Sequence, residues 1–142
     1  LKCEPSICYE VIFSKKDLIH DRPSFLLNIT NDAWFGITSG PWQHLSMTRF
    51  RSIERGLPLI RVANSGISAV FDQNGKKMKS MSLNTEGFID FDLDINNSIS
   101  HYSKFGLWSI LHLIILLVLF SIFFDNFNLI KNKVMDLRKG KI

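Results

Sequence analysis

The sequence has little cysteine. Cys3 and Cys8 are the only two, and neither belongs to a CxxC pair or to a Cys/His cluster with metal-ligand spacing. This scarcity excludes a disulfide framework and gives no support to a structural zinc site. In an extended strand the two cysteines would point to opposite faces about 16 Å apart, whereas a disulfide needs Cα atoms within about 7 Å. We predict that Cys8 is a free thiol and that the protein uses no metal or other cofactor.

A basic face is also missing from most of the chain. Residues 1–104 hold twelve Lys/Arg against eleven Asp/Glu, whereas residues 105–142 hold five against two. The excess that raises the isoelectric point to about 9.2 therefore lies largely in a short tail. Nucleic-acid binding requires Lys and Arg clustered on the folded domain. The charge distribution excludes nucleic acid as the expected partner.

The start of the sequence lacks an initiator methionine and a signal peptide. Its 142 residues leave room for one domain and a tail. We expect a C-terminal piece of a longer protein, with a missing N-terminal half. The alternative is a complete small domain that has lost only its first methionine.

Cys8 follows a short apolar run near the start of the chain. The pattern favours a strand that ends near Cys8, then a turn into a helix that continues through Ser14 towards His20 and must stop before Pro23. The thiol would lie at a strand-to-helix elbow, where backbone N–H groups can hold an oxyanion. No base or cation that would activate the thiol is obvious from the sequence. The alternative is an ordinary buried cysteine.

A second strand is predicted at residues 25–29, because five mostly apolar residues there fit a buried parallel sheet. It runs into a polar segment that contains Asn31, Trp34 and Phe35. Ligands in open sheets collect beyond the ends of parallel strands, so this segment is a candidate binding loop. Alternatively, the two aromatic side chains simply cap the core.

The next segment, residues 42–55, has the pattern of an amphipathic helix with Pro41 in its first turn. Apolar residues recur at Leu45, Met47, Phe50 and Ile53. We expect His44 to be packed or hydrogen-bonded, because no second metal ligand shares its face. Short strands should follow at residues 59–63, 67–72, 77–81 and 87–93, with a hairpin turn at residues 73–76. The domain is therefore predicted to be mixed α/β.

Residues 105–124 carry no formal charge and are mostly Ile, Leu, Val and Phe. As a helix they would span about 30 Å, the thickness of a bilayer core, so we predict a transmembrane helix. Five basic residues lie beyond it, and the positive-inside rule then places residues 125–142 in the cytoplasm and residues 1–104 outside. Residues 127–138 form a candidate short interfacial helix.

Four motifs occur in order along the chain: Ile-Cys-Tyr-Glu at 7–10, Asn-Asp-Ala-Trp-Phe-Gly at 31–36, Gly-Pro-Trp-Gln-His at 40–44, and Arg-Val-Ala-Asn-Ser-Gly-Ile-Ser-Ala-Val at 61–70. Together they resemble the apolipoprotein N-acyltransferase family, the membrane branch of the carbon–nitrogen hydrolase (nitrilase) superfamily. The resemblance covers nearly the whole chain but only the C-terminal part of the family's length. It implies an α/β fold, the C-terminal part of a nitrilase-type αββα sandwich followed by one transmembrane helix. It also implies the bacterial inner membrane, with residues 1–104 on the periplasmic side.

The resemblance also implies a reaction. Cys8 would take a fatty acyl group from a phospholipid donor as a thioester and pass it to the N-terminal amine of the diacylglyceryl-cysteine of a lipoprotein. The N–H of Tyr9 would help to bind the oxyanion, and Glu10 would hold the elbow or the acceptor amine. Trp34 and Phe35 would border the pocket for the acyl chain, with Asn31 fixing their loop.

The chain departs from the family at the other two members of its Glu–Lys–Cys triad. In the family both lie upstream of the cysteine strand, and Lys2 and Glu4 are too close to Cys8 to be their equivalents. We therefore expect no turnover from the isolated chain. The competing hypotheses are a membrane-tethered nitrilase-type amidase, which would keep Cys8 but hydrolyse a small amide, and an inert remnant of a split gene.

Overall fold

The computed structural model describes residues 1–14, 22–95 and 99–139. The chain divides into two compact units, Leu1–Lys104 and Phe105–Ile142, which are described separately below. Helix α2 (His101–Phe105) lies at the boundary between them. The predicted helix beyond Ser14 falls largely on residues outside the described ranges.

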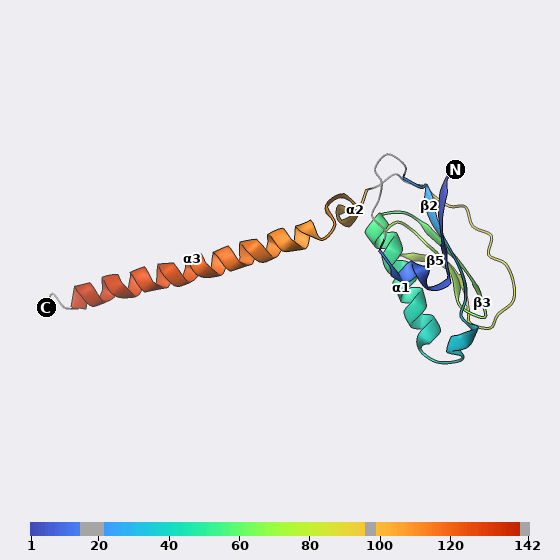
Figure 1. Cartoon of the computed structure of the whole chain (residues 1–142), viewed down its shortest axis with the longest axis horizontal. Helices are drawn as coiled ribbons and strands as arrows, with labels where there is room; N and C mark the ends of the chain where they lie inside the picture. Colours follow the sequence, from blue (N-terminus) through green and yellow to red (C-terminus); the bar gives the residue numbers. More distant parts are fainter. Residues whose placement is uncertain (15–21, 96–98, 140–142) are drawn as a thin grey trace. The chain divides into compact units, whose positions relative to one another are not determined.

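The first unit is built on one five-stranded sheet (Figure 1). Its strands lie side by side in chain order: β1 (Cys3–Ile7), β2 (Phe25–Asn31), β3 (Leu59–Asn64), β4 (Ser68–Phe71) and β5 (Lys77–Met81). The first three are parallel and the last two pair antiparallel, so the predicted mixed α/β class is confirmed. The register pairs Ile7 with Ile29 and Asn31 with Asn64, so the carboxyl ends of β1, β2 and β3 meet at one edge.

Helix α1 (Gly40–Arg55) lies along one face of this sheet (Figure 1) and confirms the helix predicted after Pro41. Pro41 occupies its first turn, where the missing N–H costs nothing. At the other end Gly56 has a φ of 60° and its N–H caps the helix. A left-handed residue at this position is readily supplied by glycine.

The buried face of α1 differs from the predicted one. Of the four apolar residues that marked the amphipathic pattern only Leu45 is buried, and Met47, Phe50 and Ile53 are exposed. The face against the sheet is mainly polar: His44, Leu45, Thr48, Ser52 and Arg55. The prediction failed because the sheet offers this helix polar partners, so that polar side chains are satisfied in the interior.

The hydrophobic core lies beside this polar contact. It consists of Leu26, Leu45, Leu57, Leu59, Ile67, Ala69 and Phe71. On the opposite face of the sheet the outward side chains stay open, for example Ile29 at 47% and Val62 at 51% exposed. Among the described residues the sheet therefore has one covered face and one partly open face.

The hairpin predicted at residues 73–76 is present between β4 and β5, and the Asp72 side chain accepts hydrogen bonds from the N–H groups of Asn74 and Lys76. The strand predicted at residues 87–93 is wrong, because this segment forms no ladder. Its side chains still alternate between more and less exposed positions. Alternating apolar and polar residues show which side chains face the protein, but a strand also needs a neighbouring strand that accepts its backbone hydrogen bonds.

Among its described residues, this unit also contains the 3-10 helices η1 (Cys8–Ile12) and η3 (Ala33–Phe35). Each directly follows, or nearly follows, the carboxyl end of a parallel strand.

The second unit is the long helix α3 (Trp108–Lys139). Its first 18 residues, Trp108–Asp125, have a mean hydropathy of 2.2, and none of them is buried. This is one helix long and apolar enough to cross a membrane. Residues 127–138, predicted to form a short interfacial helix, are helical and continue α3 without a break.

Candidate active site

Cys8 lies where β1 ends and η1 begins. Its φ is 50°, in the left-handed region that residues other than glycine rarely occupy. The thiol is free, as predicted, and the residue is half-buried. Glu10 reaches back across the turn and its Oε2 accepts a hydrogen bond of 2.8 Å from the N–H of Ile7. The predicted strand-to-helix elbow is therefore present, and the helix that directly follows the strand is the 3-10 helix η1.

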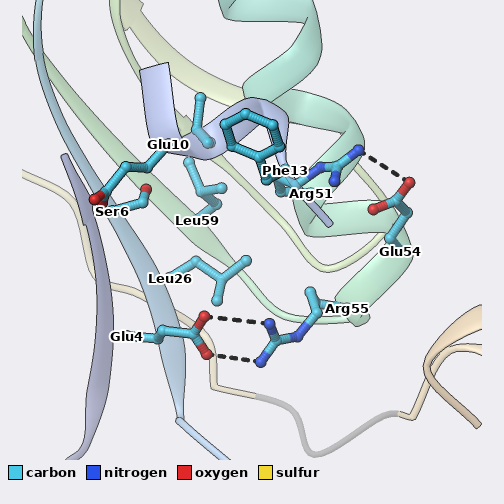
Figure 2. A pocket seen from close by; sticks show the side chains of 10 residues that line it. Glu4, Ser6, Glu10, Phe13, Leu26, Arg51, Glu54, Arg55 and Leu59 are labelled. Carbon is cyan, nitrogen blue, oxygen red and sulfur yellow. Dashed lines mark hydrogen bonds and ion pairs between the residues drawn. The ribbon is translucent and has the colours of Figure 1, made fainter. Parts of the chain in front are cut away.

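A small cavity lies on the side of the elbow that faces α1 (Figure 2). Glu10, Phe13 and Leu26 line it, together with the ion pairs Glu4–Arg55 and Arg51–Glu54. Its volume of about 30 Å³ has room for about two water molecules. Neither Cys8 nor Trp34 lines this cavity. It is too small for an acyl chain, and the two ion pairs form part of its wall.

The loop after β2 presents an aromatic side chain to solvent. The side-chain oxygen of Asn31 accepts a hydrogen bond from the N–H of Ala33, which turns the chain, and Trp34 Nε1 donates to the carbonyl of Asn31 at 2.9 Å. These contacts fix the direction of the indole while leaving it 84% exposed. Phe35 is half-buried, and a Cβ at Gly40 would come within 2.5 Å of its ring. Asn31 therefore fixes the loop, as predicted.

His44 joins this loop to the elbow. Its ring lies 5.3 Å from the ring of Tyr9 and 6.0 Å from that of Phe35, measured between centroids. Tyr9 directly follows the cysteine, and Phe35 directly follows Trp34. Because β1 and β2 are parallel neighbours, both segments leave the same edge of the sheet. The structure thus brings Tyr9 and Phe35, the residues that directly follow Cys8 and Trp34, onto one histidine of α1.

A buried polar cluster lies directly beneath these loops. Its members are Asn28, Asp32, His44, Thr48 and Arg61. Arg61 is 1% exposed and donates from Nη2 to Asp32 Oδ2 at 2.6 Å, and from Nη1 to Asn28 Oδ1 at 2.5 Å and Thr48 Oγ1 at 2.9 Å. Its Nε donates to the carbonyl of Ile67. The second oxygen of Asp32 lies 2.9 Å from His44 Nδ1.

The electrostatics of the cluster rest on the Arg61–Asp32 pair. Burial lowers the pKa of the Arg61 guanidinium, and the charge and hydrogen bond of Asp32 oppose that effect. The charge of Cys8 opposes it as well. Nη2 of Arg61 is also 3.2 Å from His44 Nδ1. Nδ1 lies closer to the Asp32 carboxylate than to Arg61, so a proton on Nδ1 would be donated to Asp32, whereas the guanidinium offers only donors.

Asn28 connects this cluster to the elbow. Its side-chain nitrogen donates to the carbonyl of Cys8 at 3.3 Å and to the carbonyl of Ser6 at 3.1 Å. Asn28 is 0% exposed, so water does not compete for these bonds. The Asn28 side-chain amide therefore links the buried guanidinium of Arg61 to the backbone carbonyl of Cys8.

The residue patterns in the sequence missed the roles of Asn28, Asp32 and Arg61. Asp32 had been assigned to a polar loop, and the other two lie within apolar strands. A signal was available in the alternation of the strands, because residues two apart face the same side of a sheet. Asn28 lies two residues after Leu26 and Arg61 two residues after Leu59, and both leucines belong to the core. A charged residue at an inward strand position requires a partner in the interior. Among the described residues no group of three or more His, Cys, Asp or Glu could hold a metal.

Comparison with known proteins decides the family. A model described as carbon–nitrogen hydrolase matches residues 2–100. The chain belongs to the carbon–nitrogen hydrolase family. This carbon–nitrogen hydrolase chain is also similar to many curated proteins named apolipoprotein N-acyltransferase, so the resemblance carried by the four motifs is confirmed.

Three of these relatives show the extent of the similarity. The protein from Rhodopseudomonas palustris is 48% identical over 103 residues, which cover 72% of this chain and 19% of the relative. The protein from Rickettsia bellii is 41% identical over 138 residues, or 94% and 26%. That from Rickettsia prowazekii is 42% identical over 131 residues, or 88% and 26%. The chain therefore spans about a fifth to a quarter of the curated relatives it matches.

Among solved structures, a carbon–nitrogen hydrolase superfamily protein from Xanthomonas campestris superimposes with a TM-score of 0.49 at 19% identity. The superposition covers 59% of this chain and 37% of that chain.

Proposed function

We propose that the chain carries the nucleophile of an apolipoprotein N-acyltransferase, with Cys8 as the residue that accepts the acyl group. The observation that carries the proposal is the position of Cys8. A half-buried free thiol lies on a left-handed elbow, at the same sheet edge as the exposed indole of Trp34. The names of the relatives support the same activity.

The reaction has two acyl-transfer steps. In the first, the Cys8 thiolate attacks an ester carbonyl of a phospholipid, the C–S bond forms, and the lyso-phospholipid leaves with a proton on its oxygen. In the second, the N-terminal amine of a diacylglyceryl-cysteine attacks the thioester, the amide C–N bond forms as the C–S bond breaks, Cys8 leaves as a thiolate, and a general base takes the proton that the amine loses. Splitting the transfer into two steps lowers each barrier. The N–H of Tyr9, directly after the nucleophile, would stabilise the oxyanion, and the Glu10 side chain, bonded to the N–H of Ile7, would hold the turn.

The acyl donor is proposed to bind along the exposed aromatic loop. Trp34 offers a broad apolar surface, and Phe35 continues it towards His44. Such rings bury large apolar areas with few rotatable bonds. The lipid donor and the lipoprotein acceptor are both membrane molecules, so the catalytic unit has to work at a bilayer.

The chain is proposed to sit in the bacterial inner membrane. Segment 105–124 of the chain would cross the bilayer, residues 1–104 would form the periplasmic part of the carbon–nitrogen hydrolase domain, and residues 125–142 would be cytoplasmic. The apolar stretch of α3 and the basic residues after it support this arrangement.

Turnover is proposed to require two more residues, the glutamate and lysine of the family's triad, supplied by a longer chain or by a partner polypeptide. In the elbow itself, Glu10 is engaged with the backbone of Ile7 and is poorly suited to act as the general base.

The experiment measures acylation of Cys8 by mass spectrometry. The chain is reconstituted in phospholipid vesicles, alone and together with the part of the Rickettsia bellii relative that precedes the matched region. We expect a fatty-acyl thioester on the Cys8 peptide only in the combined sample. Cys3 is the internal control and should stay unmodified. An adduct that persists in Cys8→Ser, or no adduct with the partner present, would refute the proposal.

A further inference from the structure

We propose that Asn28, held in one orientation by Arg61, is a positioning residue for the Cys8 elbow. This inference rests on the proposed role of Cys8 as the nucleophile. It assigns a function to the buried polar cluster, which the two acyl-transfer steps do not use directly.

The orientation of the Asn28 amide follows from its neighbours. A guanidinium group has only donors, so the group facing Arg61 Nη1 at 2.5 Å must be the amide oxygen. The amide nitrogen then faces Ser6 and the carbonyl of Cys8 at 3.3 Å. Arg61 therefore determines that Asn28 presents a donor, and not an acceptor, to the elbow.

Cys8 needs such a contact because of its backbone. A left-handed conformation at a non-glycine residue costs of the order of 1–3 kcal/mol and persists only when its surroundings fix it. Two contacts fix this turn, one on each side of the cysteine. The Glu10 carboxylate binds the N–H of Ile7, and Asn28 binds the carbonyl of Cys8. Only the second comes from the interior, where water cannot replace it.

The same bridge places a positive charge near the thiol. Arg61 directs Nη1 towards Asn28 and Nη2 towards Asp32, so the cation lies between the elbow and its counter-ion. The interaction between this guanidinium and the charge of Cys8 raises the pKa of Arg61 against the lowering by burial. The other titratable groups on the elements around the elbow are Cys3 and Glu4 on β1, Tyr9 and Glu10 on η1, Asp32 after β2, and His44, Arg49, Arg51, Glu54 and Arg55 on α1. Of these, the carboxylates oppose the thiolate.

The test follows alkylation of Cys8 by iodoacetamide in the full chain, in detergent micelles, between pH 5 and pH 10. Peptide mass spectrometry measures Cys8 and Cys3 in the same sample, so Cys3 corrects for reagent and pH. The plateau rate at high pH reports access to the thiol, and the half-maximal pH reports how readily it ionises. No lipid is involved, so this test can succeed even where acylation of Cys8 fails.

Three variants and one control separate the outcomes. Asn28→Thr removes the bridge without adding a charge, Asn28→Asp keeps an acceptor for Arg61 but loses the donor, and Arg61→Lys keeps the cation. Asn64→Asp is the matched control, because it adds the same charge at an exposed position on the same sheet edge.

We expect Asn28→Asp to raise the half-maximal pH for Cys8 by about one unit, with a smaller rise in Asn28→Thr and the smallest in Arg61→Lys. The Cys3 profile and the Asn64→Asp protein should match the unmodified chain. A Cys8 profile in Asn28→Thr that coincides with that of the unmodified chain would overturn the proposal. An equal rise in Asn64→Asp would do the same, since it would show a general charge effect. If Asn28→Asp fails to fold, Asn28→Thr alone decides.

Discussion

At the scale of single residues, Arg61 is a cation buried in the interior of the first unit, where it needs a counter-ion and hydrogen-bond acceptors. It is fully buried, and hydrogen bonds to Asp32, Asn28, Thr48 and the carbonyl of Ile67 satisfy its donors. Gly66 leaves room for this arrangement, because a Cβ there would lie 2.7 Å from an oxygen of Asp32. A buried ion pair adds little net stability compared with apolar packing, but losing one partner is costly.

The first prediction concerns Asp32→Asn, which keeps the shape and removes the charge. Arg61 would then be a buried cation without a counter-ion, so we expect a loss of about 3–5 kcal/mol in the free energy of unfolding. Urea unfolding of the full chain in detergent, followed through labelling of Cys8, measures it. Asp90→Asn is the control, because Asp90 is exposed. A loss no larger than that of the control would show that Asp32 does not hold the cation.

At the scale of elements, the sequence predicted best those strands and helices whose position depends only on local burial or on local backbone geometry. The apolar run at residues 25–29 and the proline and glycine around α1 located these elements, because burial and backbone geometry do not depend on distant partners. The buried face of α1 was not predictable in this way. Thr48 looks like a surface residue until the sheet places Arg61 opposite it, and Ser52 is buried with its hydroxyl bonded to the carbonyl of Arg49 within α1.

The site shows the same division. The elbow at Cys8 and the turn at Asn31 depend on local geometry and were predicted. The contact of Tyr9 and Phe35 with His44 joins three separate elements, so no local pattern contains it. The segment 87–93 failed for the complementary reason, since its alternation predicts a strand but nothing in the sequence tells whether a neighbouring strand is free to pair.

The second prediction tests the short helix η1 as an element. Glu10→Ala removes the acceptor for the N–H of Ile7. A hydrogen bond to a charged group contributes about 1.5–3 kcal/mol, so we expect amide exchange at Ile7 to accelerate by at least tenfold. Hydrogen–deuterium exchange with fragmentation measures this, and Glu86→Ala at an exposed position is the control. Unchanged exchange at Ile7 would mean that the elbow holds without Glu10.

At the scale of the whole molecule, the two units have opposite solvent requirements. The sheet unit has its own core, whereas none of the residues in the apolar stretch of α3 is buried. A mostly apolar stretch of 18 residues exposed to water would be a strong driving force for aggregation, and a bilayer removes that cost. The partly open face of the sheet, with Ile29 and Val62, is a second apolar surface whose exposure to water is unfavourable.

The third prediction is that the chain stays with membranes on alkaline carbonate extraction. Leu116→Arg combined with Leu119→Arg should release it, because each arginine at the centre of a span costs about 2.5–3.5 kcal/mol on insertion. The matched control is Leu116→Ala with Leu119→Ala, which should remain bound. Release of the unmodified chain would remove the basis for a membrane span.

The fourth prediction concerns orientation and uses Cys3, which is exposed and free. In a Cys8→Ser background, a membrane-impermeant maleimide should label Cys3 in intact spheroplasts. A Lys131→Cys reporter, in a chain without the two native cysteines, should react only after lysis. The reason is the row of Lys and Arg after the apolar stretch, which resists transfer across the inner membrane. The reverse pattern would place Cys8 in the cytoplasm, away from the proposed periplasmic lipoprotein acceptors, and would contradict the acyl-transfer proposal together with the orientation.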